Sequence, residues 1–507
     1  MASWYQLPEE IRRAVLDPLL HDGCRLADFA TVSREWQAII EKHTFSRIKL
    51  TPSRIGQLGS MVPHHRRSLV GYIWLCLELP EYDCLMCDPQ DQDSWGLSST
   101  GNILVTKSFQ ALFSTLSVWE PSGSLLLDIS IYSPSDSEHW FKYLTFEPDV
   151  LANTSGQDQH AIQTMLAKAK AKTEVTDHHH GWVAGSRKSV PSDTAVEKLF
   201  EEIMDLGPFD DDEEESQWWK QLPLVPAITG VLLRQQNRRR WRPATLGHIF
   251  ALLPGLQEIH YEPWREWLDI QQRWTDESFC LLLDSFSSDR LRRLVLFENF
   301  DQTYPASFTN LGCDPVRIPS SHVSRAVANA SFSLEHLSAS FIVEASQFFD
   351  IRELSWTWPN LTWLALTSRL LKPHESPTEL DNMLKAAAEA AMKMPSLETM
   401  EIWNGDKGLA MFFRHQSAKG AQPAVITCRG TWELTLRPLV IQAWDAVAMR
   451  DRGQGHVIVK EVLDAGVVIR CHGDAIRHLN LSKPIIRPVS LRQIQMEYML
   501  REGVQIQ

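Results

Sequence analysis

The apolar positions of the first fifty residues recur at the spacing of short amphipathic helices. Ile11, Val15 and Leu19 follow one another at intervals of four residues, which places them on one face of a helix. This helix is predicted to begin at Pro8, because proline is well tolerated at the first helical position. Two more short helices follow, the second of them capped by Ser33. Three such helices bury little apolar area alone, so the unit needs a neighbour to cover its apolar face.

From about residue 69 the pattern alternates between strands and helices. Residues 70–79 and 124–131 have the composition of strands, and residues 102–118 between them have the apolar spacing of a helix. After residue 240, five helical or loop stretches are each followed by a core of the form L-x-x-L-x-L. These cores begin at Leu256, Leu291, Leu334, Leu361 and Leu397.

The five cores resemble leucine-rich repeats, in which each repeat of about 20–29 residues contributes one short parallel strand. Here the intervals between cores run from 27 to 43 residues, so the pattern predicts an irregular, solenoid-like stack with insertions. The fold class expected for the chain is mixed: short all-α helices, then an irregular α/β leucine-rich-repeat-like solenoid, then an α+β C-terminal cap. A conventional α/β domain, in which leucine-rich strands follow helices by chance, is the alternative.

Two segments depart from this alternation. Residues 152–216 are poor in apolar residues and carry blocks of charge, so they are predicted to be a mobile, low-complexity insertion. Residues 421–507 combine strand-like and helical stretches, as expected of a small cap or a separate domain. The predicted divisions of the chain are 4–48, 65–151, 152–216, 217–420 and 421–507.

Composition narrows the possible partners and compartments. The net charge of −13 argues against general affinity for nucleic acid or for anionic membranes. No apolar stretch of about 18 residues occurs, so no transmembrane helix is predicted. The N-terminus lacks a cationic region followed by an apolar core, so no secretory signal is expected. The eight dispersed cysteines are then expected to be reduced thiols in the cytoplasm or nucleus.

The sequence contains no motif that predicts an enzyme, a cofactor or a metal. Phosphate loops, zinc-binding HExxH helices and GxSxG elbows are all absent. Cys84 and Cys87 form a single CxxC without a second pair nearby, so packed or surface thiols are favoured over a metal site. The three histidines at 178–180 are interpreted as a solvated loop. The basic run 238–242 could import the protein into the nucleus or bind an anion, but pairing with tryptophans and with the nearby acidic run is favoured.

The N-terminal pattern resembles the F-box. The resemblance rests on Leu7-Pro8-x-Glu10-Ile11, then on single leucines, then on Val32-Ser33-Arg34-x-Trp36. Pro18 interrupts the usual leucine run, and Ser33 stands where cysteine is common. By motif position, the residues expected to contact a Skp-type adaptor are Leu7, Pro8, Ile11, Leu16, Leu26 and Val32. Those expected to pack inside the F-box are Val15, Leu19, Phe29 and Trp36.

The chain as a whole is similar to F-box proteins with leucine-rich C-terminal regions, especially divergent fungal members. The resemblance implies a substrate-recognition subunit of a Skp–cullin–F-box ubiquitin ligase, which binds the adaptor, and cullin through it, by the F-box and an unknown target protein by the leucine-rich body. An ordinary helical cap on the next domain is the alternative for the N-terminal unit. For the whole chain, the alternatives are an F-box-containing scaffold outside a ligase and an enzyme assembled from distant positions.

Overall fold

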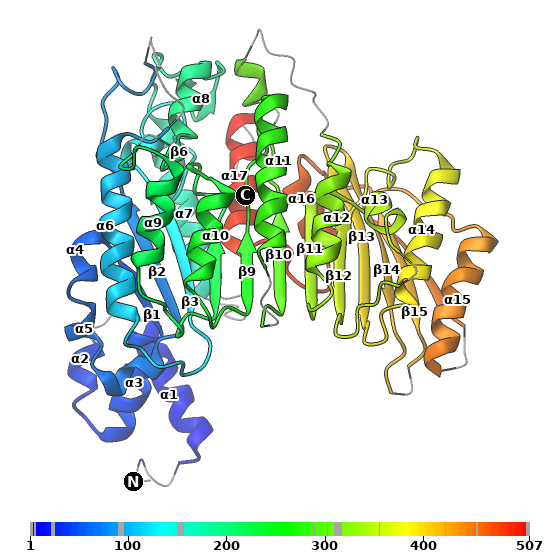
Figure 1. The fold of residues 1–507 in the computed structure, drawn as a ribbon, viewed down its shortest axis with the longest axis horizontal. Coiled ribbons are helices and arrows are strands. Elements are labelled where there is room, and N and C mark those ends of the chain that lie inside the picture. Colours follow the sequence, from blue (N-terminus) through cyan, green and yellow to red (C-terminus); the bar gives the residue numbers. More distant parts are fainter. Residues whose placement is uncertain are drawn as a thin grey trace.

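The structure is a computed structural model of the chain, and it describes most of the 507 residues. Among the described residues, twelve strands form one long sheet that is covered by helices on both faces (Figure 1). The N-terminal helices lie below one end of this sheet in the same view. The described residues are 4, 7–21, 26–89, 96–149, 157–205, 207–286, 290–301, 303–308, 317–353, 355–420, 422–452 and 455–502.

The sheet is mostly parallel, and its strands lie side by side in the order of the chain. All neighbouring strands from β1 to β13 are parallel, β13, β14 and β15 pair antiparallel, and β16 returns parallel to β15. The strands are β1 (Arg47–Leu50), β2 (Tyr72–Glu78), β3 (Leu126–Tyr132), β7 (Gly230–Leu233), β9 (Glu258–Tyr261), β10 (Arg293–Phe297), β11 (His336–Glu344), β12 (Trp363–Thr367), β13 (Thr399–Asp406), β14 (Leu409–Gln416), β15 (Val425–Gly430) and β16 (Val457–Val462).

Most connecting helices pack on one face of the sheet, the face toward the viewer in Figure 1. Parallel strands need such crossover connections, since a tight turn cannot join them. These helices are α4 (Pro52–Ile55), α5 (Leu58–Met61), α6 (Ser99–Leu116), α9 (Asp212–Gln221), α10 (Pro243–Ala251), α11 (Asp269–Asp284), α12 (Ser321–Ala330), α13 (Ala345–Asp350), α14 (Pro377–Ala391) and α15 (Pro438–Arg452).

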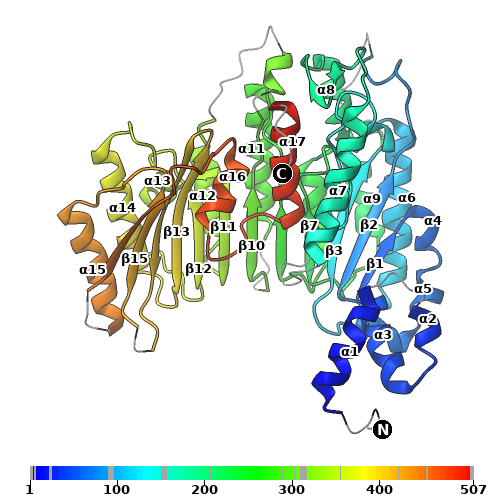
Figure 2. The same cartoon turned by 180° about the vertical axis from the view of Figure 1, so that it is seen from behind.

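The opposite face carries α7 (Gln157–Glu174), α16 (His472–Leu479) and α17 (Pro488–Glu502), which stand in front of the sheet in Figure 2. In the described part of the chain, no helix has the length and apolar character needed to cross a bilayer. The remaining elements are α1 (Glu9–His21), α2 (Leu26–Phe29), α3 (Arg34–Phe45), α8 (Asp193–Leu199), the hairpin strands β4 (Trp182–Val183) and β5 (Ser186–Arg187), the paired strands β6 (Glu202–Ile203) and β8 (Arg240–Trp241), and the 3-10 turns η2 (His64–Leu69), η3 (Pro134–Ser137) and η4 (Pro305–Ser307).

The central strands are buried on both faces, which explains why their sequences are continuous apolar runs without alternation. Every residue of β7 and β12 is buried. The largest core lies between the sheet and the helices of the first face. Two smaller cores, both rich in aromatic residues, include side chains of α17 and α16 on the second face.

The sequence located β2, β3 and the strands β9 to β13 but missed β1, β7 and β14, and the mixed α/β class is confirmed. Each of the five leucine-rich cores contains one strand of the series β9 to β13. The predicted cap, residues 421–507, extends the same sheet through β15 and β16. Its last two helices turn back across the second face, so α17 lies near the middle of the sheet rather than at its end (Figure 2).

Residues 152–216 differ from the expected insertion, because α7, α8 and the beginning of α9 fold there. α7 directs Met165 and Ala169 into one of the aromatic cores. The acidic run forms the first turn of α9, where the helix dipole favours carboxylates, and Asp211 caps that helix. A low apolar content therefore did not prevent folding, because the few apolar side chains share one face. Residues 152–156 and 206 of this prediction lie outside the described residues.

Candidate functional site

The N-terminal helices are held together by aromatic side chains around Trp36. The Trp36 ring lies 5.5 Å from that of Trp4 and 6.4 Å from that of Phe29, measured between ring centroids. The Trp4 indole N–H donates to Glu35 at 3.0 Å. Ser33 caps α3, because its hydroxyl accepts from the Trp36 backbone N–H at 3.2 Å. The unit therefore has a small core of its own.

Three of the predicted adaptor contacts are exposed on this unit. Ile11 is 49% exposed and Val32 is 60% exposed, which is high for branched apolar side chains, and Pro8 is exposed as well. Leu7 and Leu26 are half-buried. Exposed apolar side chains on a small helical unit are typical of a surface that another protein covers. These five residues therefore remain available for contact with a partner.

The other residues of the F-box-like pattern are distributed differently from the expectation. Leu16, expected to contact the adaptor, is completely buried in the chain's own core. Val15, expected to pack inside, is exposed. Leu19, Phe29 and Trp36 are half-buried, in keeping with a packing role. The structure thus places Leu16 among packing residues and Val15 on the surface beside Ile11, one helical turn away.

The helical unit contacts the body through α3. Ile40 of α3 is buried. Arg66, from the turn η2, forms an ion pair with Glu41 at 2.7 Å and lies over the ring of Phe45 at 5.0 Å. The unit lies below the β1 end of the sheet, on the side opposite the carboxyl ends of the parallel strands (Figure 1). An adaptor bound to α1 and α2 would leave those carboxyl ends free.

A cavity of about 650 Å³ opens beside the carboxyl ends of β7 and β9. This is the edge of a parallel sheet where ligands commonly bind. Its described lining includes no histidine and no cysteine. Burial raises the pKa of Glu202 to about 6 and that of Glu262 to about 7, so these two carboxyls of the cavity ionise less readily than exposed ones. Trp274 and Ile270 of α11 line the same cavity with exposed apolar side chains.

Arginines of the basic run 238–242 form ion pairs and an aromatic contact within the protein, as the pairing interpretation predicted. Arg238 lies over the ring of Trp264 at 4.1 Å, and Arg240 pairs with Glu266 at 2.6 Å. Arg242 pairs with Asp212 of the acidic run at 3.0 Å. A guanidinium buried among such partners is not displayed as an import signal or an anion-binding patch.

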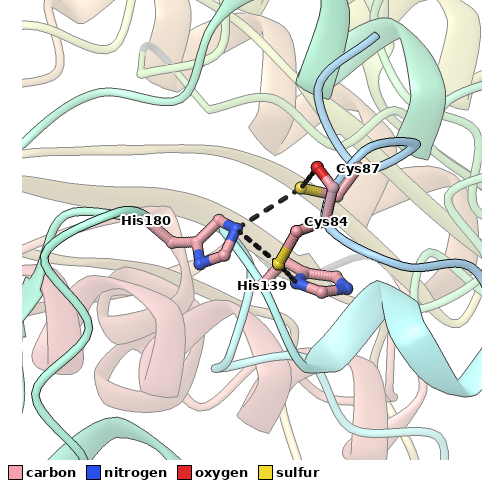
Figure 3. A group of neighbouring side chains, drawn as sticks. All are labelled: Cys84, Cys87, His139 and His180. Atoms are coloured by element: carbon pink, nitrogen blue, oxygen red, sulfur yellow. Dashed lines mark hydrogen bonds between the residues drawn. The ribbon is translucent and has the colours of Figure 1, made fainter.

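Four side chains that the sequence treated separately converge near the carboxyl ends of β2 and β3. Cys84, Cys87, His139 and His180 each direct one nitrogen or sulfur atom toward the others, and these four atoms lie within 4.8 Å of one another (Figure 3). His180 is buried, unlike the solvated histidine loop that was expected. In the sequence, only the CxxC pair indicated a possible metal site, because the two histidines lie far from it along the chain.

Comparison with known proteins identifies one match. A family model described as a family of unknown function (DUF6546) matches residues 286–487. This span runs from the end of α11 to the residue before α17, and it excludes the N-terminal helices and the four converging Cys and His side chains. No curated protein and no solved structure matches the chain.

Proposed function

We propose that this protein is a substrate-recognition subunit of a Skp–cullin–F-box ubiquitin ligase. In this proposal, α1 to α3 dock on a Skp-type adaptor and the α/β body holds a target protein. The observation that carries the proposal is the exposure of Pro8, Ile11 and Val32, three apolar residues at motif positions. Their exposure on a unit with its own aromatic core supports docking of a partner there.

The body supports the second half of the proposal through its architecture. Parallel strands that follow one another in chain order, with helices on the connecting face, agree with an irregular leucine-rich-repeat-like stack in which each unit packs on its neighbours. The exposed Trp274 and Ile270 border the large cavity among paired arginines and carboxylates. Tryptophan and arginine are the residues most enriched at binding hot spots. We therefore assign target contact to this edge of the body.

Such a receptor requires no catalytic residue of its own. Holding a target beside the ubiquitin carrier raises the effective concentration of the target's lysines, and this positioning is the contribution of the receptor. The helical unit lies below the β1 end of the sheet, and the cavity lies at the carboxyl ends of β7 and β9. This separation suits the division of roles, because adaptor and target would bind different parts of the molecule.

The adaptor contact is tested by placing a charge on the proposed surface. Val32→Asp buries a carboxylate in the interface, where its desolvation costs several kcal/mol, so recovery of the adaptor should fall at least about tenfold. Val462→Asp is the matched control, because Val462 is 59% exposed, close to the 60% of Val32, and lies in β16, at the end of the sheet opposite β1. Adaptor and cullin are quantified after co-purification with each full-length variant.

The outcomes separate the competing functions. Equal adaptor recovery with Val32→Asp and Val462→Asp would contradict the assigned surface. Adaptor recovered without cullin would favour an F-box-containing interaction scaffold outside a ligase. We expect both proteins to be recovered with the wild type and with Val462→Asp, but not with Val32→Asp.

A further inference from the structure

We propose that Cys84, Cys87, His139 and His180 form a tetrahedral zinc site that fastens three connections of the fold together. Cys84 and Cys87 lie in the segment after β2, His139 in the segment after β3, and His180 in the segment after α7. The four ligand atoms lie within 4.8 Å of one another (Figure 3). A set of two thiols and two imidazoles is a common ligand set of structural zinc.

The interatomic distances fit a single metal ion. The Cys87 sulfur lies 3.4 Å from Nε2 of His180, and the Cys84 sulfur lies 3.8 Å from the same nitrogen. The Cys84 sulfur is also 3.5 Å from Nδ1 of His139. Zinc bonds of about 2.3 Å to sulfur and about 2.0 Å to nitrogen at tetrahedral angles place these atoms about 3.5 Å apart. A two-iron cluster would hold the imidazoles and the sulfurs on different metal atoms, farther apart than this.

Both histidines are oriented by hydrogen bonds on their outer nitrogens. Nδ1 of His180 donates to the Asp177 carboxylate at 2.8 Å, and Lys142 pairs with the same carboxylate at 2.8 Å. Nε2 of His139 lies 3.4 Å from the backbone carbonyl of Tyr82, to which it can donate. In each ring the other nitrogen is then free of a proton and faces the sulfurs. Such outer partners accompany nearly every metal-bound histidine.

The charges of the proposed site balance. On binding Zn²⁺, the two thiols lose their protons to solvent, and the two thiolates offset the charge of the ion while both imidazoles stay neutral. Four protein ligands leave no position open for water or substrate, so the site is structural. Cys84 is exposed and gives the ion a route of entry, whereas Cys87 and His180 are buried and shield it.

Cysteine-dependent catalysis is the competing interpretation of the same residues. Cys87, His180 and Asp177 are placed like a nucleophile, its base and an orienting carboxylate. That arrangement would leave Cys84 and His139 without a role, although both direct an atom into the cluster. A nucleophile also has to be reached by its substrate, and Cys87 is buried. The full set of four ligands therefore favours a metal.

The metal content of the purified full-length chain tests the proposal. The untagged protein is expressed with zinc in the medium, purified with a reductant and without chelator, and analysed by plasma mass spectrometry. We expect about one zinc ion per chain in the wild type. Cys84→Ser and His139→Ala should each lower the zinc content at least about tenfold, in line with the loss of one ligand. His178→Ala is the matched control, because this neighbouring histidine is exposed and outside the cluster.

A second measurement keeps the test valid if a variant fails to fold. Cobalt replaces zinc in the wild type, and tetrahedral cobalt bound to thiolate gives intense visible bands and a charge-transfer band in the near ultraviolet. A wild-type chain without zinc and without these bands would overturn the proposal. Zinc lost from His178→Ala but kept by Cys84→Ser would also overturn it, since the ion would then sit on the histidine run. Metal-free wild type whose Cys87 is rapidly alkylated would favour the catalytic alternative.

Discussion

At the scale of single residues, His336 is a buried titratable group without a hydrogen-bond partner. Its ring stacks on Trp363 with 4.1 Å between centroids, and neither ring nitrogen has a partner among the described residues. Burial, and to a smaller extent the nearby cations Arg293 and Lys483, lowers the pKa of His336 to about 2. The folded chain therefore keeps this ring neutral, whereas the unfolded chain protonates it below about pH 6.5. His336 thus lowers stability progressively as the pH falls below 6.5.

We predict that His336→Phe stabilises the protein. Phenylalanine keeps the stacked shape and removes two unpaired polar atoms, so the free energy of unfolding should rise by about 1–2 kcal/mol at pH 7. Below pH 6.5 the advantage should grow by up to about 1.4 kcal/mol per pH unit. Urea unfolding at pH 7, 6 and 5 measures both effects. His322→Phe, at an exposed position of α12, is the control, and a constant difference between His336→Phe and wild type at all three pH values would contradict the argument.

At the scale of elements, α17 is fixed to the second face of the sheet by buried charge. Glu497 accepts hydrogen bonds from Arg238 and, at 2.9 Å, from Gln493. Arg501 of the same helix pairs with Asp301. All these side chains are buried, so water cannot replace the partner when one member of a pair is removed.

We predict that removing one member of the Arg238–Glu497 pair lowers the free energy of unfolding more than replacing both members with apolar side chains. Glu497→Ala leaves the Arg238 guanidinium buried and unpaired, so the free energy of unfolding should fall by about 3–5 kcal/mol. The double variant with Arg238→Met and Glu497→Leu removes both charges with apolar side chains of similar size and should recover most of that loss. Urea unfolding of the three proteins measures the difference. A double variant as unstable as Glu497→Ala would show that packing of α17, and not the unpaired charge, sets the cost.

The sequence predicted those elements whose signal is local. Each leucine-rich core encodes a strand, and Ser33 encodes the start of α3, because spacing and capping act within a few residues. The position of α17 was not predictable, since Arg238 and Glu497 are 259 residues apart and meet only through the topology. The same holds for Cys84 and His180, which come from different connections. Contacts of this kind depend on the completed fold.

At the scale of the whole molecule, the two ends of the chain differ in how they are attached to the body. The N-terminal helices contact the body where α3 meets the turn η2, and Glu41 of α3 forms an ion pair with Arg66 of that turn. The C-terminal helix α17 makes several buried contacts near the middle of the sheet, including Ser490 to Glu262 and Gln493 to Thr145. A docking module can be attached by few contacts, as the N-terminal helices are, whereas a helix that stabilises the fold needs many buried contacts, as α17 has.

Truncation at each end should therefore have opposite effects. A chain that begins at Ser46 keeps the hydrogen bond from Tyr72 of β2 to its Ser46 carbonyl and should melt within a few degrees of the full chain. If the proposed function holds, this chain no longer binds the adaptor. A chain that ends at Arg487 removes the ion-pair partners of Arg238 and Asp301 and uncovers the aromatic core that Val489, Met496 and Leu500 of α17 help to form, so its melting temperature should fall by about 10 °C or more. Circular dichroism follows both melts. Unfolding of the chain from Ser46 would show that the N-terminal helices belong to the body, because a separable docking unit can be removed without loss of the fold that carries it.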